Sequence, residues 1–488
     1  MTEGSVATAD LRAESAVKAA PDRLAIALAY GYGLLVVAGL GYVLLSVPIQ
    51  VGDGFTNMLA LPGTDLGTMV YNQFFQSSYL RPLLWGHLKV IFMLADGNYF
   101  EWFRGWHVFQ ILLLVVMFIG LLKPRTATDA AVVPLGLAVL VGIHTFQGTV
   151  REAFPINTFM TVLLCCLGAA HLAIGRHHWW RDIAAALLFV FAALTVESGL
   201  LVWVVFAGAF IAGARGVSRT GVAALTLLLG GYFYLRFAVL HVGGPGLVER
   251  SSGYGFSAYD PEQLIAMFGG NPLPFYAYNV VTSAVSVLFA EPRAGVFRVT
   301  RSLLEDDLRD YMMVNVVASL LSTMVLGWFM WHRRRAWISR QFERSDQLVF
   351  LFLSILAANA VISYPYTKDV IMSPAGMFYG LAVAVAAREL IAVAWRHRVS
   401  FAAALVVLTA ASAAWGVRAV GAHVGVRESG AKVRNEWAYI DQENDPERAV
   451  LTDPGLLKLK QQLLEDAIIR HPNLPALWGD WMDWLDLD

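Results

Sequence analysis

The stretch LAIALAYGYGLLVVAGLGYVLLSV, from Leu24 to Val47, decides the fold class, because it is apolar throughout and carries no charge. A helix rises about 1.5 Å per residue, so a run of this length can cross the ~30 Å hydrocarbon core of a bilayer. The preceding residues 1–23 are polar, and no small-residue cleavage site follows Val47. We therefore expect a cytoplasmic N-terminal segment and a retained first membrane helix, not a signal peptide.

The composition of the whole chain agrees with this stretch. Of the 488 residues, 57% are hydrophobic and 15% are charged, whereas soluble proteins carry about 25% charged residues. The mean hydropathy of +0.56 excludes a soluble enzyme. Lysines and arginines form only short clusters between apolar runs, so no surface for nucleic acid is expected. The adjacent Cys165 and Cys166 lie inside an apolar run and are interpreted as packing residues.

Further apolar runs predict an all-α polytopic membrane protein with about eleven transmembrane helices. The expected spans are 24–47, 105–122, 130–147, 156–174, 183–196, 199–213, 219–241, 312–331, 347–363, 370–390 and 401–421. The expected organisation is an N-terminal segment 1–23, a membrane core 24–241 with a first outer loop 48–104, a large outer loop 242–311, C-terminal transmembrane helices 312–421, and an extracytoplasmic tail 422–488 with a helix at 454–470.

Basic clusters set the expected topology, because lysine and arginine accumulate in cytoplasmic loops. The clusters are Lys123/Arg125, Arg176/Arg181, Arg215/Arg219, Arg333 to Arg335 with Arg340 and Arg344, and Arg396/Arg398. If the apolar segment 80–95 or 275–290 crossed the membrane fully, every later basic cluster would move to the other side of the membrane. Both segments are therefore expected to be re-entrant or surface-lying helices. The same reasoning requires a break at Glu197 on the outer side.

Six charged residues fall at the predicted outer ends of membrane helices, where ionisable groups are by default functional candidates. They are Asp53, Arg81, Glu152, Glu197, Arg236 and Lys368. We expect them to converge on one outer cavity. Asp53 lies between two glycines that permit a tight turn, and it is interpreted as a general base or, alternatively, as an ordinary turn residue.

The Arg81-Pro82 pair predicts the start of a helix, where a guanidinium and the helix dipole together favour a phosphate group. Contact with lipid headgroups is the alternative for Arg81, as it is for Arg236. Glu152 and Lys368 have charged neighbours and could instead form local ion pairs. No histidine or cysteine spacing predicts a zinc site, and the sequence leaves the use of a divalent metal open.

The order of these motifs resembles the GT-C superfamily of membrane glycosyltransferases, and within it the branch of protein O-mannosyltransferases and lipid A aminoarabinose transferases. The matching stretches are Asp53, the segment Tyr79 to Leu84 (YLRPLL), the segment Trp102 to His107 (WFRGWH), Glu152, Glu197, and Tyr364 to Lys368. In contrast to many relatives, Gly54 follows Asp53 and Val196 precedes Glu197.

The resemblance implies an inverting glycosyltransferase at the outer face of a bacterial inner membrane. It would move a sugar from a polyprenyl-phosphate carrier to a hydroxyl of a glycan, lipid or protein acceptor, in contact with membrane lipid. The implied residues are Asp53 and Glu152 for catalysis, and Arg81, Glu197, Arg236, Tyr366 and Lys368 for substrate binding. Two alternatives remain open, namely a transporter or flippase of lipid-linked saccharides and a polysaccharide polymerase or ligase.

Overall fold

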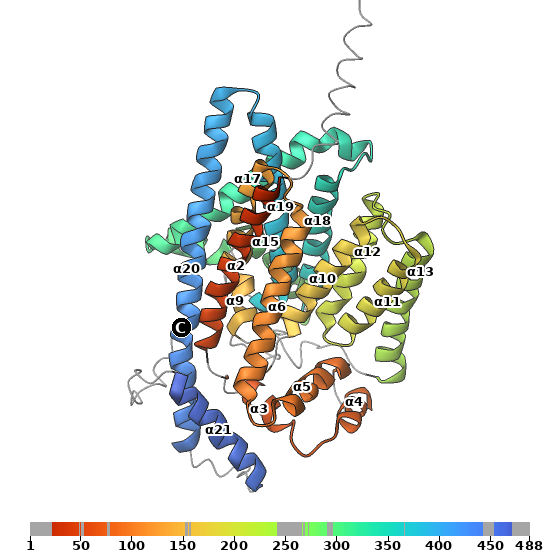
Figure 1. The fold of residues 1–488 in the computed structure, drawn as a ribbon, viewed down its shortest axis with the longest axis vertical. Helices are drawn as coiled ribbons and strands as arrows, with labels where there is room; N and C mark the ends of the chain where they lie inside the picture. Colours follow the sequence, from red (N-terminus) through yellow and green to blue (C-terminus); the bar gives the residue numbers. More distant parts are fainter. Residues whose placement is uncertain are drawn as a thin grey trace, which may run out of the picture.

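A computed structural model describes residues 22–47, 49, 53–75, 79–151, 155, 158–241, 266, 269–271, 273–289, 296–365, 367–442 and 453–470. Every regular element within these residues is helical, and the helices form one elongated bundle (Figure 1). Most of the predicted outer loop before 273 and the end of the predicted tail after 470 lie outside the described residues.

The first half of the chain forms α2 (Arg23–Leu45), α3 (Asp53–Leu59), α4 (Leu66–Phe75), α5 (Pro82–Ala95), α6 (Tyr99–Leu122), α7 (Ala127–Ala131), α8 (Val133–Gly142), α9 (His144–Arg151), α10 (Thr158–Ile174), α11 (Trp179–Ala193), η1 (Glu197–Leu200), α12 (Leu201–Ile211), α13 (Arg219–Phe233) and η2 (Tyr234–Val239). The second half forms α15 (Leu273–Phe289), α16 (Val296–Leu304), α17 (Asp310–Ile338), α18 (Arg344–Ile362), η3 (Asp369–Met372), α19 (Ser373–Ala394), α20 (Arg398–Gln442) and α21 (Pro454–Arg470).

Seven of the described helices are long and apolar enough to cross a membrane, and the bent pair of α7–α8 with α9 would make an eighth. They are α2, α6, α13 with η2, α17, α18, η3 with α19, and α20. The polytopic membrane class is therefore confirmed, whereas the number eleven stays a prediction. The remaining expected spans, α10, α11 and η1 with α12, are helical but shorter, at 17, 15 and 15 residues.

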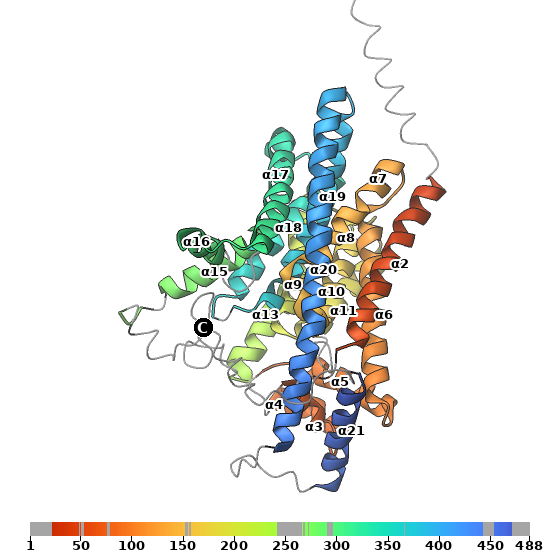
Figure 2. The same ribbon diagram turned by 90° about the vertical axis from the view of Figure 1, so that its left-hand side faces the viewer.

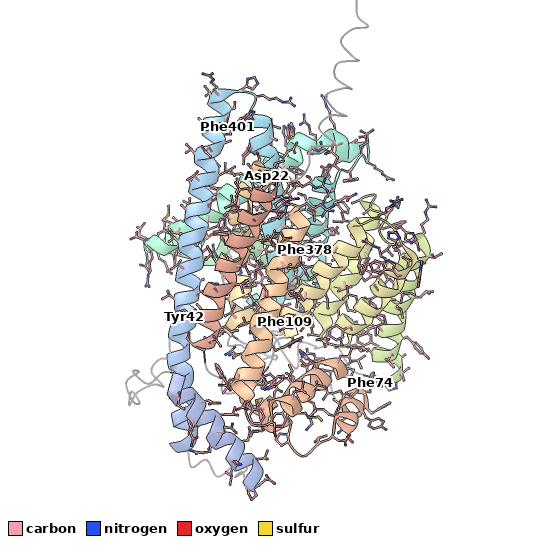
Figure 3. All side chains as sticks on the ribbon, viewed as in Figure 1. Asp22, Tyr42, Phe74, Phe109, Phe378 and Phe401 are labelled. Atoms are coloured by element: carbon pink, nitrogen blue, oxygen red, sulfur yellow. The ribbon has the colours of Figure 1, made fainter. Side chains whose placement is uncertain are left out.

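Helix α19 forms the centre of the bundle, and Figure 3 marks its Phe378 deep among the other helices. Every residue from Ser373 to Ala387 is buried, which requires neighbouring helices on all sides. Close approach to α8 depends on Gly136, because a Cβ at this position would lie 2.9 Å from the Cβ of Ala384. Small residues that let helix backbones approach are the usual device of helix packing in membranes.

The predicted span 130–147 is wrong as a single helix, because α8 and α9 meet at an angle of 66°. The bend frees carbonyl groups at the end of α8, and α20 supplies donors for two of them. Arg418 Nε donates to the carbonyl of Gly142 at 2.9 Å, and His423 Nε2 lies 3.0 Å from the carbonyl of Val141. Unsatisfied carbonyls are costly in a membrane interior, so α20 stabilises the bend.

Basic clusters from different loops meet at one end of the bundle, the upper end in Figure 3, where Asp22 and Phe401 are labelled. The amide of Asp22 donates to the carbonyl of Arg125 at 3.0 Å, and Arg344 Nη2 donates to the carbonyl of Leu121 at 2.9 Å. These contacts join the loops after α6 and before α18. They agree with the expectation that the two clusters share one side of the membrane.

The opposite end carries a layer of short helices, formed by α3, α4, α5 and α21 (Figure 2). A second hydrophobic cluster holds this layer together, and it joins Met58 of α3, Leu88 of α5 and Leu463 of α21. Helix α5 covers the predicted surface-lying segment 80–95, and α21 begins and ends where the sequence predicts a tail helix. The tail helix thus packs against the first predicted outer loop.

Helix α20 continues unbroken past 422, the predicted start of the tail, to Gln442. The boundary between membrane helix and tail stays a prediction. No proline interrupts this stretch, and 45 helical residues extend about 68 Å, roughly twice the ~30 Å hydrocarbon core. Helix α20 therefore projects beyond the bundle toward α21, as Figure 2 shows.

Candidate functional site

The chain breaks between α11 and α12 at the position predicted from the charge pattern. Helix α11 ends at Ala193, and the short 3₁₀ helix η1 begins at Glu197. The turn is tight, because a Cβ on Gly199 would lie only 2.0 Å from the carbonyl oxygen of Ala192. Only glycine allows η1 to fold back this closely on the end of α11. This close approach fixes the position of Glu197 at the start of η1.

The start of α5 docks onto the same break. The amide of Leu83 donates to the carbonyl of Leu194 at 3.1 Å, which joins the first turn of α5 to the end of α11. Pro82 occupies the first helical position, as predicted, where the missing amide proton costs nothing. Arg81 is the N-cap residue, and its backbone position brings its side chain to the break.

Arg81 and Glu197 form an ion pair in which both donors reach one oxygen. Nη2 of Arg81 lies 2.6 Å and Nε lies 3.1 Å from Oε2 of Glu197. The guanidinium also lies 4.5 Å from the ring centroid of Tyr79, which is cation–π geometry. The two charged side chains are 28% and 22% exposed, so the pair sits at an accessible edge.

A second guanidinium reaches the same carboxylate from η2, which is a π-helical segment. Nη1 of Arg236 lies 3.3 Å from Oε1 of Glu197, and the side chain is only 5% exposed. The same nitrogen donates to the hydroxyl of Tyr232 at 2.9 Å. A π-helix widens the backbone locally and often marks a functional position. Figure 1 shows the lower end of α11 close to α5.

We refer to Arg81, Glu197 and Arg236 as the charged triad. Glu197 lies in the break, outside the candidate membrane spans. Burial by itself would raise the pKa of its carboxyl, but the guanidinium of Arg81, followed by that of Arg236, holds the pKa below its usual value. The carboxyl is therefore an anion, and the triad has a net charge of about +1.

The triad has hydrogen-bonding capacity left over. Among the described residues, the buried Oε1 of Glu197 and Nε of Arg236 have no hydrogen-bond partner. The 3.3 Å contact between Oε1 and Arg236 Nη1 is an ion pair, but it is not aligned as a hydrogen bond. Paired guanidinium groups with spare donors suit a phosphate oxygen, because arginine binds phosphate through two parallel N–H groups.

The structure brings together three of the predicted site residues. Lys368 precedes η3, a segment that packs against α9. Asp53 is the first residue of α3, and its side chain lies outside the described part of the structure. Glu152 and Tyr366 also lie outside the described residues. The roles assigned to these four residues stay predictions.

Two further features of the site were not predicted from the sequence. Tyr232 was missed as a partner, although its spacing of four residues from Arg236 places both on one helix face. The hydrogen bond between Leu83 and Leu194 joins segments that are far apart in the chain, and the sequence gives no signal for it.

No group of three His, Cys, Asp or Glu side chains in the described part of the chain could hold a metal ion. Comparisons with family models, with curated proteins and with solved structures found no match to this chain. The assignment of a function therefore rests on the chemistry of the triad and on the order of the sequence motifs.

Proposed function

We propose that this chain is a membrane glycosyltransferase that moves a sugar from a polyprenyl-phosphate carrier to an acceptor hydroxyl, at the outer face of a bacterial inner membrane. The observation that carries the proposal is the charged triad. Two guanidinium groups share one carboxylate at the end of the bundle opposite the basic loops. Such a site would stabilise negative charge that develops on a departing phosphate.

The proposed reaction is a single displacement. The acceptor oxygen attacks the anomeric carbon, the bond between that carbon and the phosphate oxygen breaks, and the configuration of the sugar inverts. Polyprenyl phosphate departs as a stable anion, so it needs no strong general acid. The acceptor proton does need a base, because a hydroxyl has a pKa far above 7, and Asp53 is the proposed base. Glu152 is the alternative base.

Arg81 would bind the phosphate, and Glu197 would hold Arg81 in place. Two donors of Arg81 converge on Glu197 Oε2, which restricts the rotation of the guanidinium. Its 28% exposure leaves the group accessible to a ligand. Arg236 lies deeper and would add positive charge without moving, since it is fixed by Tyr232. A prearranged charge of this kind costs little reorganisation during the reaction.

The experiment supplies purified protein in lipid nanodiscs with a panel of labelled polyprenyl-phosphate sugars and a membrane extract as the source of acceptor. We expect consumption of one carrier and an inverted product. The variant Arg81→Lys keeps the charge but loses the planar donor fork, so its rate should fall about tenfold or more. Arg215→Lys, at the basic end of the bundle, is the matched control and should retain the rate.

Three results would speak against the proposal. If the wild type consumes no carrier in the panel, transferase activity fails and transport of lipid-linked saccharides becomes the better hypothesis. If the product retains its anomeric configuration, the single displacement is wrong. If Arg81→Lys and Arg215→Lys transfer sugar equally well, the triad does not contact the phosphate.

A further inference from the structure

The end of the bundle opposite the triad contains a second group of cations. Arg344 begins α18, and its Nη2 donates to the carbonyl of Leu121 at 2.9 Å. Arg388 belongs to α19, and its Nη1 donates to the carbonyl of Leu122 at 3.1 Å. Two guanidinium groups from different helices therefore meet at consecutive carbonyls in the last turn of α6. Both side chains are half-buried.

Two exposed cations lie beside them. Lys123 directly follows the last turn of α6 in a left-handed conformation with φ of 50°, and Arg125 follows two residues later. We refer to Lys123, Arg125, Arg344 and Arg388 as the cationic corner. The half-buried arginines form its floor, and the exposed Lys123 and Arg125 form its lip.

The cationic corner has more positive charge than its neighbours neutralise. Asp129 pairs with Arg388 at 3.3 Å, and it also accepts hydrogen bonds from backbone amides as part of a capping box at α7. Asp346 and Glu343, the carboxylates of the α18 start, both pair with Arg333. With Arg333 included, these five cations against the three carboxylates leave a net charge of about +2.

A purely structural role does not account for this charge. The C-terminus of a helix carries about half a negative charge, which one cation is enough to offset. The cations also repel one another, since the nearby Arg344, then burial, then Arg125 lower the pKa of Lys123. Within the described residues, the buried Nε of Arg344 has no hydrogen-bond partner. The corner thus has both excess charge and an unused donor.

We propose that the cationic corner binds a phosphate-bearing anion. Arginines suit phosphate because their planar donors match two of its oxygens, and basic pockets between membrane helices bind anionic lipid headgroups. The corner lies at the ends of α6 and α18, which are candidate membrane spans, and the ends of such spans would lie near the lipid phosphates. A phospholipid headgroup and a soluble phosphate share this chemistry. The site is independent of the proposed transfer reaction.

The test measures binding of phosphatidylglycerol to purified protein by native mass spectrometry, after reconstitution in nanodiscs of phosphatidylcholine with a titrated fraction of phosphatidylglycerol. The variant is Lys123→Gln with Arg125→Gln, which removes the lip and leaves the helix-capping floor intact. A basic residue near an anionic headgroup contributes about fivefold to binding, so the double variant should bind roughly 25-fold more weakly. Lys123→Gln alone should lose about fivefold.

The matched control is Arg334→Gln with Arg335→Gln, which removes the same charge from exposed residues of α17. We expect the control to bind phosphatidylglycerol like the wild type. Competition by millimolar inorganic phosphate would identify a soluble phosphate as a ligand of the same site, and lack of competition would identify the lipid headgroup. Equal weakening in both double variants, or no weakening in either, would overturn the proposal.

Discussion

Replacement of Glu197 by glutamine should destabilise the protein strongly, because it removes the carboxylate that two arginines share. Glu197 and Arg236 are 22% and 5% exposed, and Arg81 contacts one oxygen at 2.6 and 3.1 Å. Removal of one partner from a buried ion pair costs about 3–5 kcal/mol. Since Glu197 and Arg81 retain some contact with solvent, which screens the interaction, we expect about 2–3 kcal/mol.

The assay is the free energy of unfolding of purified protein in detergent micelles, measured by denaturant titration. Asp307→Asn is the matched control, because Asp307 pairs with Arg309 at 3.7 Å while both side chains are more than 60% exposed. An exposed pair of this kind contributes about 0–1 kcal/mol. The reasoning is refuted if Glu197→Gln unfolds with the same free energy as the wild type or as the control.

A second measurement, with polyprenyl phosphate added, connects this stability effect to the proposed phosphate site. In Glu197→Gln both guanidinium groups lose their counter-charge, so polyprenyl phosphate should stabilise the variant more than it stabilises the wild type. The same ligand should have no greater effect on Asp307→Asn than on the wild type. If polyprenyl phosphate stabilises all three proteins equally, the triad does not bind the phosphate.

Further substitutions test the local geometry. Gly199→Ala should lower the free energy of unfolding by about 3 kcal/mol, because the new Cβ would lie 2.0 Å from the carbonyl oxygen of Ala192. The control Gly230→Ala, on the open face of α13, should be neutral or slightly stabilising. Arg418→Met should cost about 2 kcal/mol, because the buried carbonyl of Gly142 loses its donor at 2.9 Å. Both are measured by denaturant titration, and a neutral result for Gly199→Ala or Arg418→Met would contradict the corresponding contact.

The sequence predicts those parts of the fold that depend on hydropathy and charge. Apolar runs located the long helices, and the basic clusters placed a break at Glu197 without any structural information. The pattern failed where a distant segment decides the backbone. Donors on α20 stabilise the bend after Gly142, and they lie 276 and 282 residues away along the chain. Likewise, α20 continues beyond 421 into a polar stretch that hydropathy alone counts as tail.

The candidate site shows the same division. Charged residues at apolar helix ends identified Arg81, Glu197 and Arg236, since ionisable groups are rare there. The sequence could not indicate which of the six charges touch. The contact between Arg81 and Glu197 joins positions 116 residues apart, and it depends on the close turn at Gly199. Of the six charged residues that were expected to converge, the structure therefore brings together the three of the triad.

The most direct test of the proposed transfer compares the sugar-transfer rate of Asp53→Asn with that of Asp96→Asn, in nanodiscs containing the labelled carrier. Asp96 caps α5 with φ of 41°, a left-handed conformation that asparagine tolerates, so the control removes one nearby charge without backbone strain. A general base contributes about 10²–10⁴ in rate. We predict that Asp53→Asn loses at least about 100-fold while Asp96→Asn retains transfer. If a folded Asp53→Asn variant transfers sugar at the wild-type rate, Asp53 is not the general base, and Glu152 becomes the next candidate.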